Sequence, residues 1–379
     1  MNENKTNALP KIVLFYPLFT GGGAEAVGLW ILEALKEEYD LTLFTLTAID
    51  LNKMNSMYGT DLDSKQVRIR TVFDHRFQSL IYFLVANNKW ARMFFFHLFI
   101  RRFKQHRHEY EVPISGYNAV DLGGNGIQYI HWIKVLEGNA FFQKISDFSL
   151  SSLKSNLCLV NSQVVGETVK EVYECESKVI YPPVVLEVQD IPWKSKEDAF
   201  ICSGRLTKAK EPHRVIEILK QVRDRGFDIK LYLTGGGGGT YAVGYQRQLQ
   251  KAIAANSDWV TLYQNLPYSE YVNVLTRCKY GIHYKKEPFG ISIAEMVKAG
   301  AIPFVRSQGG QVEIVGAENE ALLFKNPKEA VEKIVNILES SDRQSDLSRN
   351  LKQRNTLFST TKFKEEMQQA VATFLAKGT

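Results

Sequence analysis

The sequence alternates short apolar runs with amphipathic segments, and it does so in two series along its 379 residues. The first series opens with KIVLFY at residues 11–16 and the second with AFICSGRL at residues 199–206. Apolar runs separated by segments of helical periodicity are typical of parallel strands joined by crossover helices. We therefore expect two doubly wound α/β domains, whose ligands bind at the carboxyl ends of the strands.

The boundary between these domains is expected near residues 186–196, which carry no strong periodicity and are interpreted as a linker. We place the first domain at residues 1–188 and the second at residues 189–358. Each is long enough to bury a proper core. Residues 359–379 are expected to form a final helix that packs back on the first domain.

Composition sets a few limits on function. The formal net charge of +6 is too diffuse to indicate nucleic acid, but it permits anionic ligands or an anionic membrane surface. The polar start of the sequence does not resemble a signal peptide, and no apolar run is long enough to span a bilayer. Four cysteines lie far apart without a C-x-x-C pair, so we expect neither a zinc site nor a disulfide framework, in a reduced cytoplasmic setting: Cys158, Cys175, Cys202 and Cys278.

The stretch EPFGISIAE places Glu287 and Glu295 eight positions apart, across a glycine-containing loop and the start of a helix. Pro288 and Gly290 disfavour helix before this point, and Ser292 is a candidate helix cap. The free N–H groups at such a helix start attract a phosphate. On this interpretation the two carboxylates bind hydroxyl groups. The alternative is structural: Ser292 and Glu295 also fit a capping box, and Glu287 alone could be a solvated charge.

Other polar residues fall at the expected carboxyl ends of strands. Gly21, Gly22 and Gly23 follow the first strand, where they would let a ligand approach the backbone, or would simply form a turn. Arg205 and Lys210 lie five positions apart in a loop of the second series, where both could contact one anion. The alternative for the two cations is a solvated loop. Their convergence with Glu287 on strand ends favours a binding site.

The segment from Ser79 to Arg107 is dense in aromatic and then in basic residues. If it is one helix, bulky apolar side chains cover nearly its whole circumference, so it must be buried or embedded. Two interpretations stay open: a core helix with a solvated basic end, or a helix at the surface of an anionic membrane. The candidate membrane residues are Trp90, Phe95, Phe96, Arg101 and Arg102.

Several motifs, in this order, resemble the retaining GT-B glycosyltransferases of the family-four type. They are GGAE at residues 22–25, YIH ending at His131, VNS at 160–162, VIYPPV at 179–184, SGRLTKAK at 203–210, and the E-x7-E pair Glu287 and Glu295. The run GIHYKKEPFGISIAEMVKAGAIPFV is most similar to mannosyltransferases that act on lipid-linked oligosaccharides. The resemblance implies two Rossmann-like domains facing a central cleft.

The resemblance also implies a chemistry. A UDP- or GDP-sugar would be held mainly by the second domain, with no cofactor and no metal, and a lipid-linked or cell-surface glycan would accept the sugar. Arg205 and Lys210 would neutralise the diphosphate, Glu287 would contact the donor sugar and His131 would position it. Glu295 would hold the ribose hydroxyls. The remaining donor-binding residues would be Gly22, Gly23, Asn265, Leu266, Phe289, Gly290, Ile291 and Ser292.

The sequence departs from the family pattern at two places. Glu211 and Pro212 follow Lys210 where the family reads K-G, and Gln311 stands where the family has proline in G-P-x-E-I. The D-x-D triplet at Asp61–Asp63 lies in a polar loop and is not interpreted as a metal site. Two rival functions are a nucleotide-sugar epimerase of the same architecture, which would need no acceptor, and a noncatalytic sugar-nucleotide-binding protein at a membrane.

Overall fold

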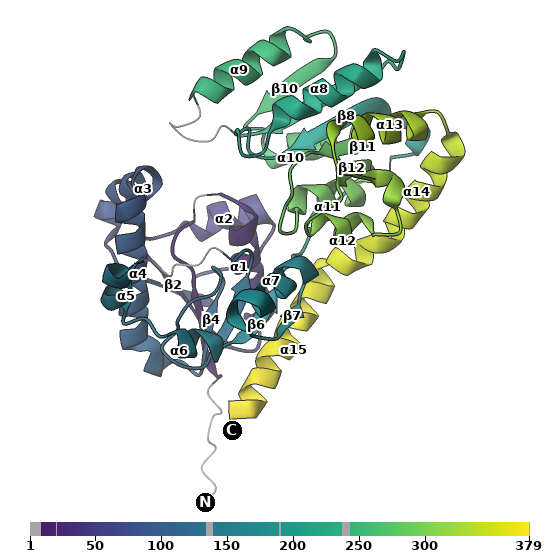
Figure 1. The fold of residues 1–379 in the computed structure, drawn as a ribbon. Coiled ribbons are helices and arrows are strands. Elements are labelled where there is room, and N and C mark those ends of the chain that lie inside the picture. The colour runs from purple at the N-terminus through teal and green to yellow at the C-terminus, as the bar shows by residue number, and fades with distance from the viewer. Residues whose placement is uncertain (1–8, 20, 134–138, 189–190, 237–242, 379) are drawn as a thin grey trace, which may run out of the picture. The chain divides into compact units, whose positions relative to one another are not determined.

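The computed structural model describes residues 9–19, 21–133, 139–188, 191–236 and 243–378. The chain divides into two compact units. Unit 1 comprises Met1–Pro183 and Thr360–Thr379, and unit 2 comprises Val184–Ser359. Each is a parallel sheet covered by helices (Figure 1). The predicted architecture of two doubly wound α/β domains is confirmed.

Unit 1 contains a seven-stranded parallel sheet in the order β3-β2-β1-β4-β5-β6-β7. The strand order reverses between β1 and β4, which marks the point where loops diverge to opposite sides. The strands are β1 (Lys11–Phe15), β2 (Asp40–Thr45), β3 (Val67–Thr71), β4 (Val112–Ser115), β5 (Ile127–Ile130), β6 (Leu157–Val160) and β7 (Ser177–Val179).

Helices of unit 1 cover both faces of this sheet (Figure 1). The last of them, α15 (Thr360–Gly378), packs along α1 (Gly23–Leu35), where the Gln368 side-chain amide donates to the Ala34 carbonyl at 2.9 Å. The others are α2 (Leu51–Tyr58), η1 (His75–Phe77), α3 (Gln78–Asn87), α4 (Lys89–His106), η2 (Arg107–Glu109), α5 (Ala140–Ser146), α6 (Leu150–Lys154) and α7 (Gln163–Tyr173).

The aromatic segment forms two helices rather than the single helix expected. Asn88 is extended and separates α3 from α4, and its side-chain oxygen accepts hydrogen bonds from the amides of Trp90 and Ala91. One face of α4 enters the core, where Phe99 and Phe103 contact Phe15 and Phe44. The core interpretation is therefore correct for this face.

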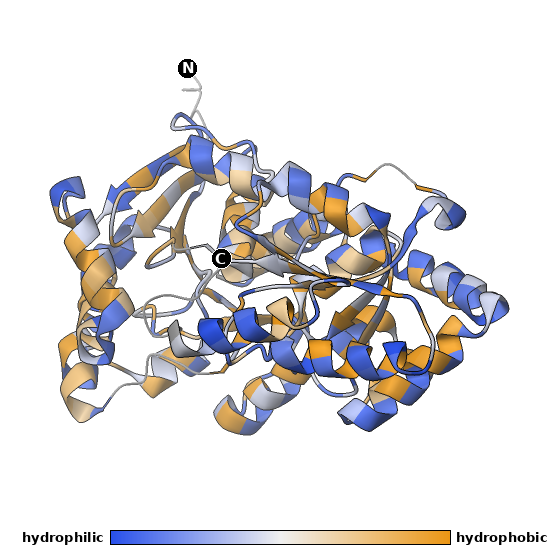
Figure 2. Ribbon diagram, turned by 90° about the horizontal axis from the view of Figure 1, so that it is seen from above, coloured by the Kyte–Doolittle hydropathy of each residue, from blue (hydrophilic) through white to orange (hydrophobic). Residues whose placement is uncertain are grey.

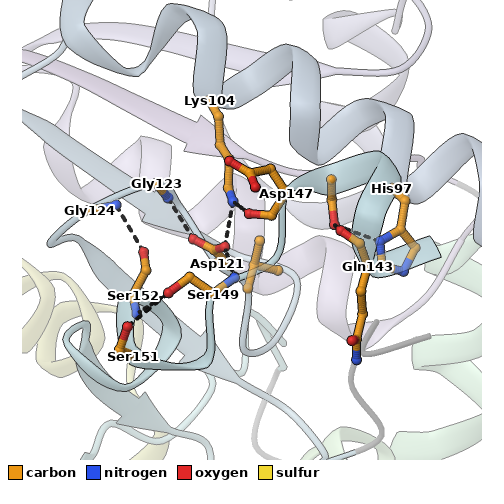
Figure 3. A network of polar contacts seen from close by, with 12 residues as sticks. His97, Lys104, Asp121, Gly123, Gly124, Gln143, Asp147, Ser149, Ser151 and Ser152 are labelled. Carbon is orange, nitrogen blue, oxygen red and sulfur yellow. Dashed lines mark hydrogen bonds and ion pairs between the residues drawn. The ribbon is translucent and has the colours of Figure 1, made fainter. Parts of the chain in front are cut away.

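A buried ion pair fixes the carboxyl end of α4 (Figure 3). The Asp121 carboxylate is inaccessible to solvent, and it binds the Lys104 ammonium and accepts hydrogen bonds from the amides of Gly123, at 2.9 Å, and Ser149, at 2.7 Å. Lys104 also donates to the Asp147 carbonyl at 2.6 Å. One carboxylate thus joins α4, the loop before β5 and the segment between α5 and α6.

Unit 2 contains a six-stranded parallel sheet in the order β10-β9-β8-β11-β12-β13, which reverses between β8 and β11. Its strands are β8 (Glu197–Ser203), β9 (Lys230–Gly235), β10 (Val260–Gln264), β11 (Cys278–His283), β12 (Ile302–Arg306) and β13 (Leu323–Phe324). Its helices are η3 (Trp193–Ser195), α8 (Pro212–Arg223), α9 (Val243–Ala254), α10 (Tyr268–Arg277), α11 (Ile291–Lys298), α12 (Gln311–Val315), η5 (Glu320–Leu322), α13 (Pro327–Leu338), α14 (Ser341–Arg354) and η6 (Asn355–Phe358).

One local expectation is wrong in unit 2. Ser292 is expected to cap α11, but it lies inside that helix, whose cap position is Gly290. Gly290 has φ 109°, a left-handed conformation that favours glycine, and so the helix begins earlier than the S-x-x-E pattern indicates.

Candidate active site

The reversal of strand order between β8 and β11 defines the candidate site of unit 2. In open α/β sheets, ligands bind beyond the carboxyl ends of the strands at such a reversal. The loop after β8 carries Arg205 and Lys210, and the loop after β11 carries Glu287. The two loops therefore flank the position where the fold favours a ligand.

Glu287 is the centre of the polar contacts at this site. One carboxylate oxygen binds the Lys210 ammonium, and the same oxygen accepts a hydrogen bond from Nε2 of His283 at 2.8 Å. Burial raises the pKa of Glu287, but the hydrogen bonds and positive charges of His283 and Lys210 outweigh it, so the pKa lies below its ordinary value. Glu287 is therefore ionised at neutral pH.

His283 is a site residue that the sequence analysis did not single out. It ends β11, is 4% exposed, and has a buried Nδ1 without a hydrogen-bond partner among the described residues. The available signal was its position four residues before Glu287. A spacing of four brings two side chains together when the strand ends between them in a tight loop. The spacing does not indicate a contact until the end of the strand is known.

Glu295 lies in α11 and does not cap it. Its carboxylate accepts a 2.8 Å hydrogen bond from the hydroxyl of Tyr271, which lies in α10. Burial raises the pKa of Glu295 to about 7, against the opposing effect of the Tyr271 hydrogen bond. Both residues lie in unit 2. Tyr271 is a second contact that the sequence analysis did not anticipate.

The remaining predicted donor-binding residues of unit 2 occupy varied environments. Arg205 is exposed and has no ion pair with a described residue. Asn265 follows β10 with φ 53°, and its amide donates to the Gly235 carbonyl at 3.2 Å. Leu266 and the α11 residues Ile291 and Ser292 are partly exposed. Phe289 is 3% exposed and packs its ring against Phe358, so its side chain anchors the loop to the core of unit 2.

In unit 1 the glycine loop lies at the carboxyl end of β1. Gly22 occupies the cap position of α1, and its amide donates to the Tyr58 hydroxyl at 3.0 Å. The Glu25 carboxylate accepts from the Gly21 amide at 2.7 Å and from Tyr58 at 3.1 Å. A Cβ atom added at Gly22 would meet nothing within 4 Å, so the backbone here is accessible to a ligand.

His131 follows β5 in unit 1 and is 4% exposed. Its Nε2 lies 3.0 Å from the carbonyl oxygen of Gly116, which can only accept, so Nε2 carries the proton and Nδ1 keeps its lone pair. Burial lowers the pKa of His131 to about 4, against the opposing effect of the Gly116 hydrogen bond. The imidazole is therefore neutral at pH 7. The Asn118 side chain fixes the backbone by accepting from the amides of His131 and Trp132.

The described residues contain no cluster of three or more His, Cys, Asp or Glu side chains placed to hold a metal ion. Asp63 of the D-x-D triplet instead accepts hydrogen bonds from the amides of Lys65, at 2.7 Å, and Gln66, at 2.9 Å. This triplet therefore belongs to a turn.

The sequence of unit 2 matches a known family. Residues 186–354 match the family model described as glycosyl transferases group 1. The matched range lies within Val184–Ser359 and contains Arg205, Lys210, Glu287 and Glu295. No curated protein matches the sequence.

Solved structures resemble the whole chain. Anabaena HepE in complex with UDP and glucose is 16% identical, with a TM-score of 0.70 over 96% of this chain and 100% of HepE. Sucrose-phosphate synthase from Thermosynechococcus elongatus is 16% identical, with a TM-score of 0.68 over 97% of this chain and 100% of the synthase. WaaG, a glycosyltransferase involved in lipopolysaccharide biosynthesis, is 11% identical, with a TM-score of 0.65 over 94% of this chain and 98% of WaaG. At these identities the likeness establishes the fold, which is GT-B.

Proposed function

We propose that this protein is a retaining glycosyltransferase that moves a hexose from a UDP- or GDP-sugar to a lipid-linked or cell-surface glycan. The observation that carries the proposal is the contact between Lys210 and Glu287 at the strand-order reversal of unit 2, within the residues that match group 1 glycosyl transferases. A cation for the leaving diphosphate and a carboxylate for the sugar are thereby held side by side.

The proposed chemistry needs charge stabilisation rather than a general-base carboxylate. As the glycosidic bond to the diphosphate breaks, Arg205 and Lys210 balance the growing negative charge. The first N–H groups of α11 have no acceptor within the helix and add a positive dipole on the same side. The acceptor hydroxyl attacks the anomeric carbon from the leaving-group face and gives its proton to the departing phosphate oxygen. Because attack and departure occur on the same face, the anomeric configuration is retained. These groups can act without a metal.

Unit 1 contributes to the proposal through His131 and the glycine loop. The unprotonated Nδ1 of His131 can accept a hydrogen bond from a hydroxyl of the donor sugar, and it keeps this ability across neutral pH because the pKa lies near 4. The open backbone at Gly22 and the exposure of Gly23 let a phosphate or sugar approach closely. We assign both a positioning role.

We propose that Glu295 holds the ribose hydroxyls and that the base lies against Asn265 and Leu266. An ionised carboxylate accepts from two ribose hydroxyls, whereas a protonated one loses part of this capacity. Since the pKa of Glu295 is about 7, its charge changes within the physiological range. Donor affinity should therefore depend on pH.

The Michaelis constant for the donor should fall as pH rises from 6 to 8. For a carboxyl group with a pKa of about 7 that must be ionised to bind, the change is about tenfold. Tyr271→Phe removes the hydrogen bond that lowers this pKa, so the inflection should move to higher pH. Initial rates over a donor concentration series at each pH measure both effects. A Glu295→Gln variant that keeps the same pH dependence would contradict the assignment.

The membrane interpretation requires a different set of residues from the one expected. Phe96 is 5% exposed and belongs to the core, and Phe95 packs against that core. The large apolar side chains that do reach solvent here form what we call the aromatic surface: Phe77, Leu80, Phe83, Trp90 and Phe141, each 52–64% exposed. Leu80 and Phe83 lie three positions apart on α3 and share one face of it, and Phe77 directly precedes this helix. The ring of Trp90 stacks on that of Phe141, with 6.1 Å between the ring centroids.

The charge around the aromatic surface favours an anionic bilayer. From His75 to His108 the sequence contains no Asp or Glu, while Lys89 and Arg92 are exposed; Arg76 is also exposed, but it pairs with Asp74 at 3.1 Å. Hydrophobic and hydrophilic residues both occur in the helices at the left edge of Figure 2, which agrees with the mixed sequence of α4. No helix among the described residues combines the length and hydropathy needed to traverse a bilayer. We propose peripheral association at the cytoplasmic face, where a lipid-linked acceptor would lie.

Replacing Phe83 and Trp90 by serine, or Lys89 and Arg92 by glutamate, should weaken binding to vesicles of phosphatidylcholine and phosphatidylglycerol by about tenfold or more. Each cation near an anionic surface contributes about 1 kcal/mol, and each inserted aromatic a comparable amount. Sedimentation with vesicles measures binding. Val172→Ser is the matched control, since Val172 is 50% exposed on α7. Equal vesicle binding by all variants would refute the assigned surface.

The activity itself is tested with a panel of UDP- and GDP-sugars, in the presence and absence of glycolipid acceptors. We expect acceptor-dependent release of UDP or GDP that persists in a metal chelator. Interconversion of the free nucleotide sugar without acceptor would instead identify an epimerase. Nucleotide binding without release or interconversion would identify a noncatalytic binding protein.

A further inference from the structure

Gln311, at the start of α12, contacts the loop that presents Glu287. We infer that Gln311 is a positioning residue, which fixes the backbone of the Lys285–Glu287 loop so that Glu287 faces the donor sugar. The inference rests on the proposed function for the role of Glu287, but its geometry stands independently.

The side chain of Gln311 uses both halves of its amide on this loop. Its Oε1 accepts from the amide of Glu287 at 2.7 Å, and its Nε2 donates to the carbonyl of Lys285 at 3.1 Å. Gln311 is completely buried. A buried amide that satisfies two backbone groups cannot be replaced by an apolar side chain of the same size without leaving them unpaired.

The two residues before Gln311 bring the backbones together. The Gly310 amide donates to the Glu287 carbonyl at 2.9 Å. A Cβ atom at Gly310 would lie 2.0 Å from the Pro288 carbonyl oxygen, and one at Gly309 would lie 2.5 Å from the Glu287 carbonyl oxygen. Only glycines allow this approach. Glu287 therefore has both its N–H and its C=O bound to residues 309–311.

The helix α12, which carries Gln311, is itself fixed in position by Arg354. Arg354 of α14 donates to the carbonyls of Glu313, at 2.6 Å, and Ile314, at 2.9 Å, at the carboxyl end of α12. Ile314 is completely buried. Gln311 thus acts from a helix whose own position is fixed, which is what a support for a reactive group requires.

The consequence concerns the direction of the Glu287 carboxylate. Lys210 and His283 bind its oxygen, but the Lys210 ammonium can follow the carboxylate if the loop shifts, because it lies at the end of a flexible side chain. The Gln311 contacts act on the backbone and leave only side-chain rotation free. Without them, Glu287 would sample several positions relative to the sugar.

The test compares Gln311→Met with the wild-type protein. Methionine keeps the buried volume but forms neither hydrogen bond. Amide hydrogen exchange in peptides covering residues 285–289 should become at least about tenfold faster, because the Glu287 amide loses its acceptor. With the sugar nucleotide that the panel identifies, kcat should fall by about 30- to 100-fold, since misplacement by about 1 Å has such effects. Affinity for UDP should stay within about threefold, because the diphosphate cations lie on another loop.

Gln344→Ala is the matched control, since Gln344 also donates to two backbone carbonyls of unit 2, those of Ile337 and Leu338. It should leave exchange in 285–289 and kcat unchanged. If Gln311→Met exchanges and turns over like the wild type while Glu287→Gln is inactive, the inference fails and the proposed function stands. If the wild type transfers no sugar, the proposed function fails, and the exchange rate alone then decides whether Gln311 holds the loop.

Discussion

Glu287→Gln is expected to reduce kcat for sugar transfer by about 10²- to 10³-fold while leaving UDP affinity within a few fold. The size of the effect follows from the loss of one preorganised charged contact to the transition state. In the ligand-free protein, Glu287 is ionised, 13% exposed in its side chain, and bound to both Lys210 and His283. An amide can still hydrogen-bond a sugar, but it cannot balance the charge of the Lys210 ammonium.

The measurement separates catalysis from binding. Single-turnover rates at saturating donor report the chemical step, and competition by UDP reports the diphosphate contacts. Glu217→Gln is the control, because Glu217 pairs with Arg214 at 2.8 Å on the surface of α8, where the two side chains are 52% and 45% exposed. Its turnover should match the wild type.

Lys210→Ala should weaken UDP binding as well as turnover. If both Lys210→Ala and Glu287→Gln transfer sugar at the wild-type rate, the site lies elsewhere.

Asp121→Asn is expected to lower the free energy of unfolding of unit 1 by about 3–5 kcal/mol, the range for breaking one partner of a buried ion pair. The Asp121 carboxylate is fully buried and satisfies Lys104 and the amides of Gly123 and Ser149. An asparagine directs an N–H₂ group at donors that already point inward, and it leaves the Lys104 ammonium with an uncharged partner. Removing this charge should therefore lower the free energy of unfolding by more than removing a charge from any surface ion pair.

Denaturant unfolding of single and double variants measures the effect. Lys104→Met alone should be strongly destabilising, and the double variant Lys104→Met with Asp121→Asn should cost less than the sum of the single changes, because neither charge is then left unpaired. Glu174→Gln is the control for a surface pair, since Glu174 binds Lys154 at 2.7 Å but is 81% exposed. It should not change the unfolding midpoint. Additive effects of the two buried changes would show that the pair is not coupled.

The sequence was sufficient to predict that three candidate residues follow strands. Arg205, Lys210 and Glu287 all follow apolar runs, and parallel strands place such positions along one edge of a sheet. The close contact between Lys210 and Glu287, 77 positions apart, follows from β8 and β11 being neighbours. Strand order could be anticipated only from the family resemblance, because periodicity identifies strands but not their partners.

The errors have local physical causes. Ser292 fits a capping pattern, but a glycine able to adopt a left-handed conformation two residues earlier starts α11 first. The break at Asn88 is hidden within a long hydrophobic run, although asparagine is among the strongest helix caps. Tyr271 and Gln311 reach Glu295 and the Glu287 loop across 24 positions each, and such contacts depend on how whole helices pack. The sequence shows that Gln311 departs from the family pattern, but the two hydrogen bonds that it forms with the Glu287 loop can be identified only from the structure.

The packing of α15 on α1 has a consequence for how the protein reaches its native state. The hydrogen bond from Gln368 to Ala34 joins positions 334 residues apart, and α1 is almost wholly buried. During synthesis, α1 and its sheet emerge first, yet the helix that covers them emerges after all of unit 2. Domains with such nonlocal contacts fold slowly and expose apolar surface while they wait. Unit 2 is continuous in sequence and needs no later segment to be complete, whereas unit 1 stays incomplete until residues 360–378 have been made.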